Sequence, residues 1–126
     1  MKIQESAENY LEAILIIKKS KGAVRSIDVA HNLGFSKPSV SYAMKQFREN
    51  GYIIIDDAGN INLTKKGLEI AERIYRRHQL LTQVLIALGV SEETAKEDAC
   101  KIEHHLSNES FDKLLEYMKK NNLLNK

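Results

Sequence analysis

The sequence predicts a mainly α-helical protein, with a winged helix-turn-helix DNA-binding domain at residues 1–70 and an α-helical metal-binding and dimerisation domain at residues 71–126. Three observations support this fold class. Six segments have helical apolar spacing, and start and stop signals enclose the first four of them. Two short apolar runs, 52–55 and 61–63, flank a turn. The chain of 126 residues, 43% of them hydrophobic, is long enough for one compact core or two small lobes.

The first three helices are each predicted from a serine that begins the segment and a glycine that ends it. In chain order these pairs are Ser6 and Gly22, Ser26 and Gly34, and Ser36 and Gly51. Pro38 falls in the first turn of the third helix, where proline is tolerated. The turn at 57–60 joins the two apolar runs into a hairpin. Three helices followed by a hairpin are typical of a winged helix-turn-helix.

The second half of the chain is predicted to hold three more helices. Thr64 caps a long fourth helix that ends at Gly89, and Ser91 caps a fifth helix whose apolar face reaches Leu106. A sixth helix begins near Asn108. So short a chain cannot bury every apolar face of the last two helices, which favours a homodimer.

Composition narrows the class of protein. Nineteen basic and seventeen acidic residues leave a net charge of +2, so binding to nucleic acid must use locally clustered positive charge. The single cysteine excludes an internal disulfide, and the N-terminus lacks the apolar core of a signal peptide. No apolar run approaches the roughly 18 residues of a membrane span. We therefore expect a cytoplasmic protein.

A candidate metal site lies in the fifth helical segment. Cys100, Glu103 and His104 have the spacing i, i+3, i+4, which places three ligand types on one face of a helix. Taken alone, Cys100 is typical of a small buried hydrophobe. Three ligand types on one face favour a metal site instead.

Other segments offer further ligands. His78 falls on the apolar stripe of the fourth helix, and Asn9 and Glu12 stand at i, i+3 on the first. Each has an ordinary alternative, as a hydrogen-bonded core histidine or as surface groups. Together with the first three, they make a mixed set suited to Fe(II), Mn(II), Co(II) or Zn(II), in which the thiolate favours Fe(II) or Zn(II).

The outward face of the third helix is short, polar and basic, as expected of a helix that enters the major groove. Arg25 would contact the DNA backbone. The side chains expected to reach base edges and phosphates are Lys37, Ser39, Ser41, Tyr42 and Lys45. The alternative is a solvated helix face. The acidic wing residues Asp56 and Asp57 oppose contact between the wing and phosphate.

The chain resembles the iron-dependent repressor family, which includes the diphtheria toxin repressor and the manganese transport regulators. Five segments carry the resemblance: Glu8-Asn-Tyr-Leu-Glu12, Ser36-Lys-Pro-Ser-Val-Ser41, Leu63-Thr-Lys-Lys-Gly67, Arg77-His-Gln-Leu-Leu81 and Ile102-Glu-His-His-Leu-Ser107. The resemblance implies a dimeric repressor whose second domain binds a divalent metal, with Fe(II) or Mn(II) expected before Zn(II) or Co(II). The metal-loaded form would bind a palindromic operator and repress metal-uptake genes.

The resemblance also assigns residues. Positions that ligate metal in manganese-type members are matched by Glu12, His78, Glu103 and His104. Cys100 stands where manganese-type members have glutamate and iron-type members cysteine, and Asn9 replaces an aspartate or methionine. Thr82 and Lys96 replace the glutamate and histidine of the iron-type ancillary site. Implied DNA contacts are Ser36, Pro38, Ser39, Ser41 and Tyr42.

Three alternatives make different predictions. A metal-independent winged-helix regulator would leave the Cys100, Glu103 and His104 spacing accidental. A metalloenzyme would need an open coordination position and a general base, and the chain has neither His-Glu-x-x-His nor a nucleophile with an evident base. A protein-interaction module would bind no DNA. We expect double-stranded operator DNA and a second copy of the chain as partners, without a membrane or a small-molecule substrate.

Overall fold

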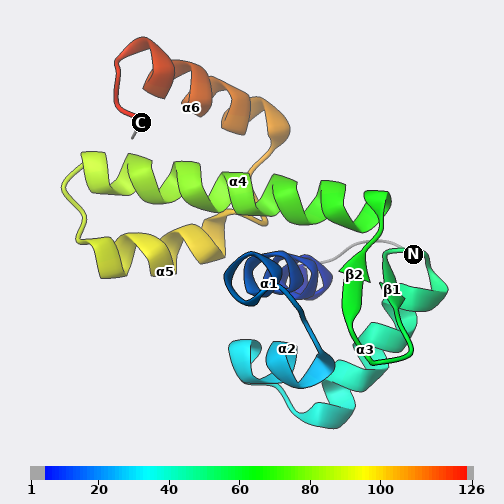
Figure 1. Ribbon diagram of the computed structural model, residues 1–126. Coiled ribbons are helices and arrows are strands. Elements are labelled where there is room, and N and C mark those ends of the chain that lie inside the picture. The colour runs from blue at the N-terminus through cyan, green and yellow to red at the C-terminus, as the bar shows by residue number, and fades with distance from the viewer. Residues whose placement is uncertain (1–4, 125–126) are drawn as a thin grey trace. The chain divides into compact units, whose positions relative to one another are not determined.

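The computed structural model describes residues 5–124 and confirms the predicted fold class (Figure 1). Its elements are α1 (Glu5–Lys21), α2 (Ser26–Leu33), α3 (Lys37–Glu49), β1 (Ile53–Ile55), β2 (Ile61–Leu63), α4 (Lys65–Ala87), α5 (Glu92–Ile102) and α6 (Asn108–Lys120). The chain divides into two compact units, Met1–Arg73 and Ile74–Lys126, with the division inside α4. Among the described helices, none is long and apolar enough to span a membrane.

The first unit is held together by an apolar core under α3. Val40, Met44 and Phe47 occupy the inward face of this helix, each at most 2% exposed. The Phe47 ring meets the edges of Tyr10 and Tyr52, with ring centroids 5.8 Å and 6.4 Å away. Such edge-to-face pairs stabilise a core beyond the area they bury. The core thereby fixes which face of α3 is left to solvent.

Local signals set most helix ends in this unit. Ser36 caps α3 as predicted, accepting a hydrogen bond from the Ser39 amide at 3.3 Å, and Gly34 ends α2 at φ +69°. Two predicted caps are wrong. Ser6 lies inside α1, which already includes Glu5. The N-cap of α2 is Arg25 rather than Ser26, because the Asp28 carboxylate, three residues on, accepts from the Arg25 amide at 2.9 Å.

The Asp28 cap predicts a pH-dependent stability. The hydrogen bond from Lys21, followed by that from the Arg25 amide, lowers the pKa of Asp28 below 3.8. Ionised Asp28 therefore stabilises the fold fully above pH 3.8, and this contribution is lost as the pH falls through the depressed pKa. Asp28→Asn is expected to lower the free energy of unfolding at neutral pH by about 0.3–1 kcal/mol. Urea unfolding from neutral pH to below pH 3.8 measures this, with the exposed Asp57→Asn as control.

The wing is an antiparallel hairpin in which Ile53 pairs with Leu63, and Ile55 with Ile61. Ile53 and Ile61 face the core, whereas Ile54 is 60% exposed, as the alternation of a strand requires. The Ile61 amide donates to the Val24 carbonyl at 2.7 Å. This bond ties the hairpin to the segment before α2, so the wing and the helix-turn-helix form one unit.

Gly67 allows α4 to start against the wing. A Cβ at this position would lie 2.1 Å from the Tyr52 carbonyl oxygen, far inside van der Waals contact. Because that atom is backbone, Gly67→Ala must displace either α4 or the chain before β1. We expect a loss of at least the roughly 1–3 kcal/mol typical of overpacking, measured by urea unfolding. Lys65→Ala, at an exposed site of the same turn, is the control and should change stability little. An unchanged midpoint in Gly67→Ala would contradict the close approach.

The second unit packs the C-terminal part of α4 against α6 around Leu80, Phe111 and Met118. Partly buried side chains surround this cluster: Val84, Leu106, Leu114, Leu115 and Leu124. The predicted fifth helix is too long, because α5 ends at Ile102 and residues 103–105 form turns. Ile102 is 38% exposed rather than on a buried face. Leu106 instead belongs to the α6 cluster, beyond the point where the chain leaves α5.

Candidate metal site and DNA-binding surface

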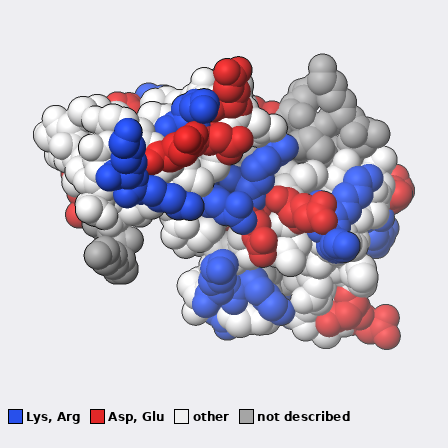
Figure 2. Space-filling view, turned by 90° about the horizontal axis from the view of Figure 1, so that it is seen from above, with Lys and Arg blue, Asp and Glu red and all other residues white. Residues whose placement is uncertain are grey.

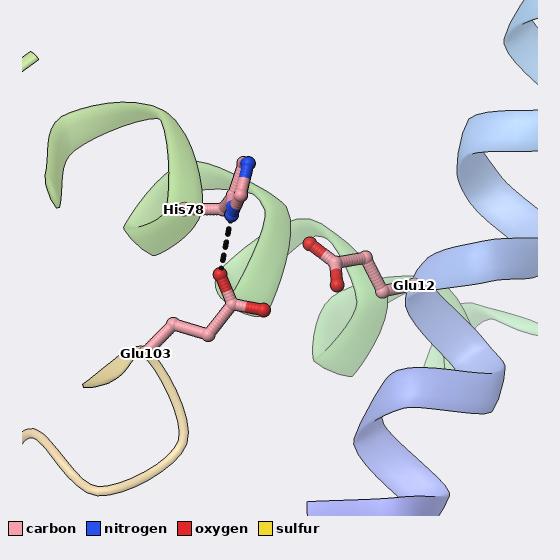
Figure 3. Close-up of side chains that lie close together, drawn as sticks. All are labelled: Glu12, His78 and Glu103. Carbon is pink, nitrogen blue, oxygen red and sulfur yellow. Dashed lines mark hydrogen bonds and ion pairs between the residues drawn. The ribbon is translucent and has the colours of Figure 1, made fainter. Parts of the chain in front are cut away.

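A buried carboxylate and an imidazole meet in the second unit (Figure 3). His78 comes from α4, and Glu103 is the C-cap residue of α5. The His78 Nδ1 atom lies 2.8 Å from Oε2 of Glu103, whose side chain is fully buried while that of His78 is 27% exposed.

The second oxygen of Glu103 is what makes this pair a metal-site candidate. Oε1 is buried and has no hydrogen-bond partner among residues 5–124. It lies 3.4 Å from Nε2 of His104, which is an ion-pair distance only if that ring is protonated, and no hydrogen bond forms. A buried carboxylate oxygen without a partner is costly, and cation coordination is one way to satisfy it. Carboxylate oxygen and imidazole nitrogen fit a divalent transition metal.

The acidic groups of α1 belong to the first unit. Glu12 is 7% exposed, so its interpretation as an ordinary surface group is wrong, whereas Asn9 is half-buried. Glu8, one turn before Glu12, is also buried, and its carboxylate pairs with Arg73 at 2.7 Å. Sequence analysis gave no role to this ion pair, because nothing in the spacing of α1 and α4 indicates that Glu8 and Arg73 meet. The same helix thus carries two buried carboxylates, and the Arg73 pair accounts for that of Glu8.

The predicted spacing of Cys100, Glu103 and His104 on one helical face is not what the structure has. Because α5 ends at Ile102, only Cys100 is helical, and it is exposed. Glu103 and His104 occupy the turn that follows, with 0% and 1% of their side chains exposed. The turn therefore buries the carboxylate and the imidazole and leaves the thiol at the surface.

The predicted DNA-contacting side chains all lie at the surface of the first unit. They are Arg25, Ser36, Lys37, Pro38, Ser39, Ser41, Tyr42 and Lys45. Tyr42 is 67% exposed, an unusual setting for so large a ring. A hollow of 280 Å³ beside α3 is lined by Ser26, Ile27, Lys37 and Ser41. The surface is therefore polar and basic, with a hollow beside α3 and an exposed Tyr42 ring.

Arg25 also contacts the wing, a feature that sequence analysis missed. Its Nη2 atom lies 2.9 Å from the point that a Cβ on Gly59 would occupy, and Gly59 has φ +86°. A side chain at position 59 would therefore displace the guanidinium. The only sequence signal was a glycine in a turn, which gives no indication of a partner.

On one face of the molecule, acidic and basic side chains are interspersed, as Figure 2 shows. The net charge of the chain is only +2. DNA binding through α3 must therefore depend on a few locally placed basic side chains rather than on bulk charge.

A winged helix-turn-helix with an exposed basic helix, followed by a helical unit in which a buried glutamate meets a histidine, fits the class of metal-responsive transcription regulators. Two family descriptions match this chain. "Iron dependent repressor, N-terminal DNA binding domain" matches residues 2–59, and "Iron dependent repressor, metal binding and dimerisation domain" matches residues 64–122. The chain belongs to the iron-dependent repressor family, which confirms the resemblance found in the sequence.

Individual relatives agree. The chain is 35% identical over 120 residues to an uncharacterised helix-turn-helix-type transcriptional regulator of Methanocaldococcus jannaschii, covering 94% of this chain and 96% of the relative. It is 37% identical over 109 residues to the transcriptional regulator MntR of Geobacillus kaustophilus, covering 86% of this chain and 77% of the relative. These relatives are transcriptional regulators by name, one of them without an established function.

Solved structures extend the comparison. The metal-dependent transcriptional regulator MtsR is 28% identical with a TM-score of 0.81, over 94% of this chain and 54% of its own. A manganese-dependent transcriptional repressor in complex with manganese is 26% identical with a TM-score of 0.80, over 94% of this chain and 53% of its own. The chain thus spans about half the length of these two structures.

Proposed function

We propose that this protein is a metal-dependent repressor that binds a palindromic operator as a homodimer when loaded with a divalent transition metal, and that it controls genes of metal-ion homeostasis. The observation that carries the proposal is the buried Glu103 carboxylate, with one oxygen on His78 and the other without a hydrogen bond among residues 5–124. It occurs in a chain whose other unit presents a polar, basic helix.

His78 and Glu103 would form the part of the metal site that the second unit contributes. Glu12 and Asn9 of α1, and Cys100 and His104 near the end of α5, are the further ligands that the family resemblance proposes. Carboxylate and imidazole ligands suit Mn(II) or Fe(II), whereas a thiolate ligand from Cys100 would favour Fe(II) or Zn(II).

The proposed ligands come from both units, which gives a physical basis for control. Glu12 belongs to the unit that carries α3, whereas His78 and Glu103 belong to the other. A divalent cation that binds one arrangement of the two units more tightly than others would couple the metal site to the unit that carries α3. Metal therefore shifts the population toward the arrangement in which the two α3 helices of a dimer match adjacent half-sites.

The test is an anaerobic fluorescence-anisotropy titration of the protein onto a palindromic operator from its own promoter region. Apo protein and protein with Mn(II), Fe(II) or Zn(II) at matched free concentrations are compared at constant salt, because phosphate contacts make the affinity salt-dependent. We expect tighter binding with Mn(II) or Fe(II). The metal-independent alternative predicts identical curves with and without metal, and that result would refute the proposal.

A further inference from the structure

Arg77 is a buried arginine whose guanidinium closes the turn between α5 and α6. It is 6% exposed and comes from α4, next to His78. Its Nη1 atom donates to the Glu103 carbonyl at 3.1 Å and to the Leu106 carbonyl. Its Nη2 atom donates to Oδ1 of Asn108 at 2.6 Å. Arg77 and the residues it contacts all lie in the second unit, so the arrangement is internal to one compact body.

These contacts hold the residue that carries the metal-site candidate. The carbonyls at the end of a helix have no intrahelical partner, and the Arg77 fork supplies donors to two that follow α5. Two consecutive residues of α4 therefore hold Glu103 in place. Arg77 donates to its backbone carbonyl, and His78 contacts its carboxylate. The guanidinium is in turn held in place, because its Cζ atom lies 5.6 Å from the centre of the Phe111 ring.

We propose that Arg77 is the positioning residue of the metal site. It sets the path of the turn at 103–107, so that the Glu103 carboxylate meets His78 in the orientation that ligation requires. This inference rests on the proposed function, because it concerns how the proposed ligand is held. Outer contacts of this kind orient a metal ligand without touching the metal.

The geometry demands arginine in particular. The Nη1 atom serves two backbone carbonyls while Nη2 serves Asn108, an arrangement that a planar fork provides. A lysine ammonium places all its donors on one atom and cannot span the same three acceptors. Arg77→Lys therefore preserves the charge and loses the positioning.

The experiment titrates Co(II) into the purified protein and follows its visible absorption, which reports the ligand set directly. Arg77→Lys, Arg77→Met and Asn108→Ala are compared with wild type. Asn108→Asp keeps an oxygen acceptor, and Arg76→Met removes the exposed neighbour on the same helix. Far-UV circular dichroism and thermal unfolding of the apo forms run alongside.

We expect both Arg77 variants to bind Co(II) about 10- to 100-fold more weakly, with an altered spectrum, while apo helicity is kept. Asn108→Ala should bind Co(II) several-fold more weakly than wild type. Asn108→Asp and Arg76→Met should keep the Co(II) affinity and spectrum of wild type. If Arg77→Met fails to fold, Arg77→Lys and Asn108→Ala decide the matter. Wild-type affinity and spectrum in Arg77→Lys would overturn the positioning role. Failure of the wild type itself to bind Co(II) would instead overturn the proposed metal site.

Discussion

Glu103→Gln is expected to abolish metal-stimulated DNA binding while the protein remains folded. Glutamine has nearly the shape of glutamate and keeps an oxygen for His78, but it supplies no negative charge to a cation. Wild type at a free metal concentration 100 times its Kd should gain about 2.7 kcal/mol in free energy of unfolding. The variant should gain nothing. Thermal unfolding with and without Mn(II), beside operator anisotropy, measures both effects.

The apo protein provides a second, opposite expectation for the same substitution. Because Glu103 is fully buried with one oxygen lacking a hydrogen bond among the described residues, its charge is costly when no cation is present. Apo Glu103→Gln should therefore be at least as stable as apo wild type. Glu97→Gln, at an exposed site on α5, is the control and should keep the full response to metal. A metal-dependent rise in stability that survived in Glu103→Gln would exclude this carboxylate as a ligand.

Tyr42→Ala is expected to weaken operator binding by about 1–3 kcal/mol, the range for the loss of a base contact. Tyr42 is 67% exposed on α3 and its removal leaves the core residues Val40, Met44 and Phe47 untouched. Binding to unrelated DNA should change little, so specificity falls with affinity. Anisotropy titrations of the metal-loaded variant onto operator and scrambled duplexes give the ratio of the two affinities, which measures specificity.

Lys45→Ala is the matched comparison for Tyr42→Ala, because it lies on the same exposed face but carries charge. It should weaken binding to both duplexes alike and reduce the salt slope of the affinity by about 0.9, as for one lost phosphate contact. If Tyr42→Ala instead lowered both affinities equally, the tyrosine would belong with the backbone contacts.

The predictable part of the fold was the part determined by neighbouring residues. Ser36, Ser91 and Ser107 each cap a helix through the amide three residues on, and Gly34 ends α2 in the left-handed conformation. Of these three serines, only Ser107 was not predicted as a cap, because the sequence analysis gave the sixth helix a start near Asn108 and no capping residue. The hairpin followed equally from two apolar runs around a turn. In each case the residues that decide the structure lie within a few positions of one another.

What escaped prediction depends on partners distant in sequence. The end of α5 at Ile102 is set beside a turn that Arg77 holds from 26 residues away, so continuing the apolar spacing to Leu106 gave too long a helix. The helical face expected for Cys100 failed for the same reason. The α2 cap was missed differently, because the Asp28 carboxylate accepts from the Arg25 amide and the helix begins one residue earlier than a Ser26 cap requires.

The candidate site was predictable in its residue types and not in its geometry. The family resemblance proposed His78 and Glu103 together, whereas their 2.8 Å contact required the fold. Glu12 was predicted as a ligand, with an ordinary surface group as the alternative, and its burial contradicts that alternative. All six ligand roles stay predictions: those of Asn9, Glu12, His78, Cys100, Glu103 and His104.

The adjacency of Arg77 and His78 on α4 also limits how this protein can evolve. Successive residues of a helix differ in direction by about 100°, so inserting one residue between them would turn one support of Glu103 away from the other. We expect related genes to carry no gaps in this segment, while point changes at positions such as Asn9 and Cys100 accumulate. Metal preference would then change by substitution of ligand side chains, while the length of the segment around Arg77 and His78 stays constant.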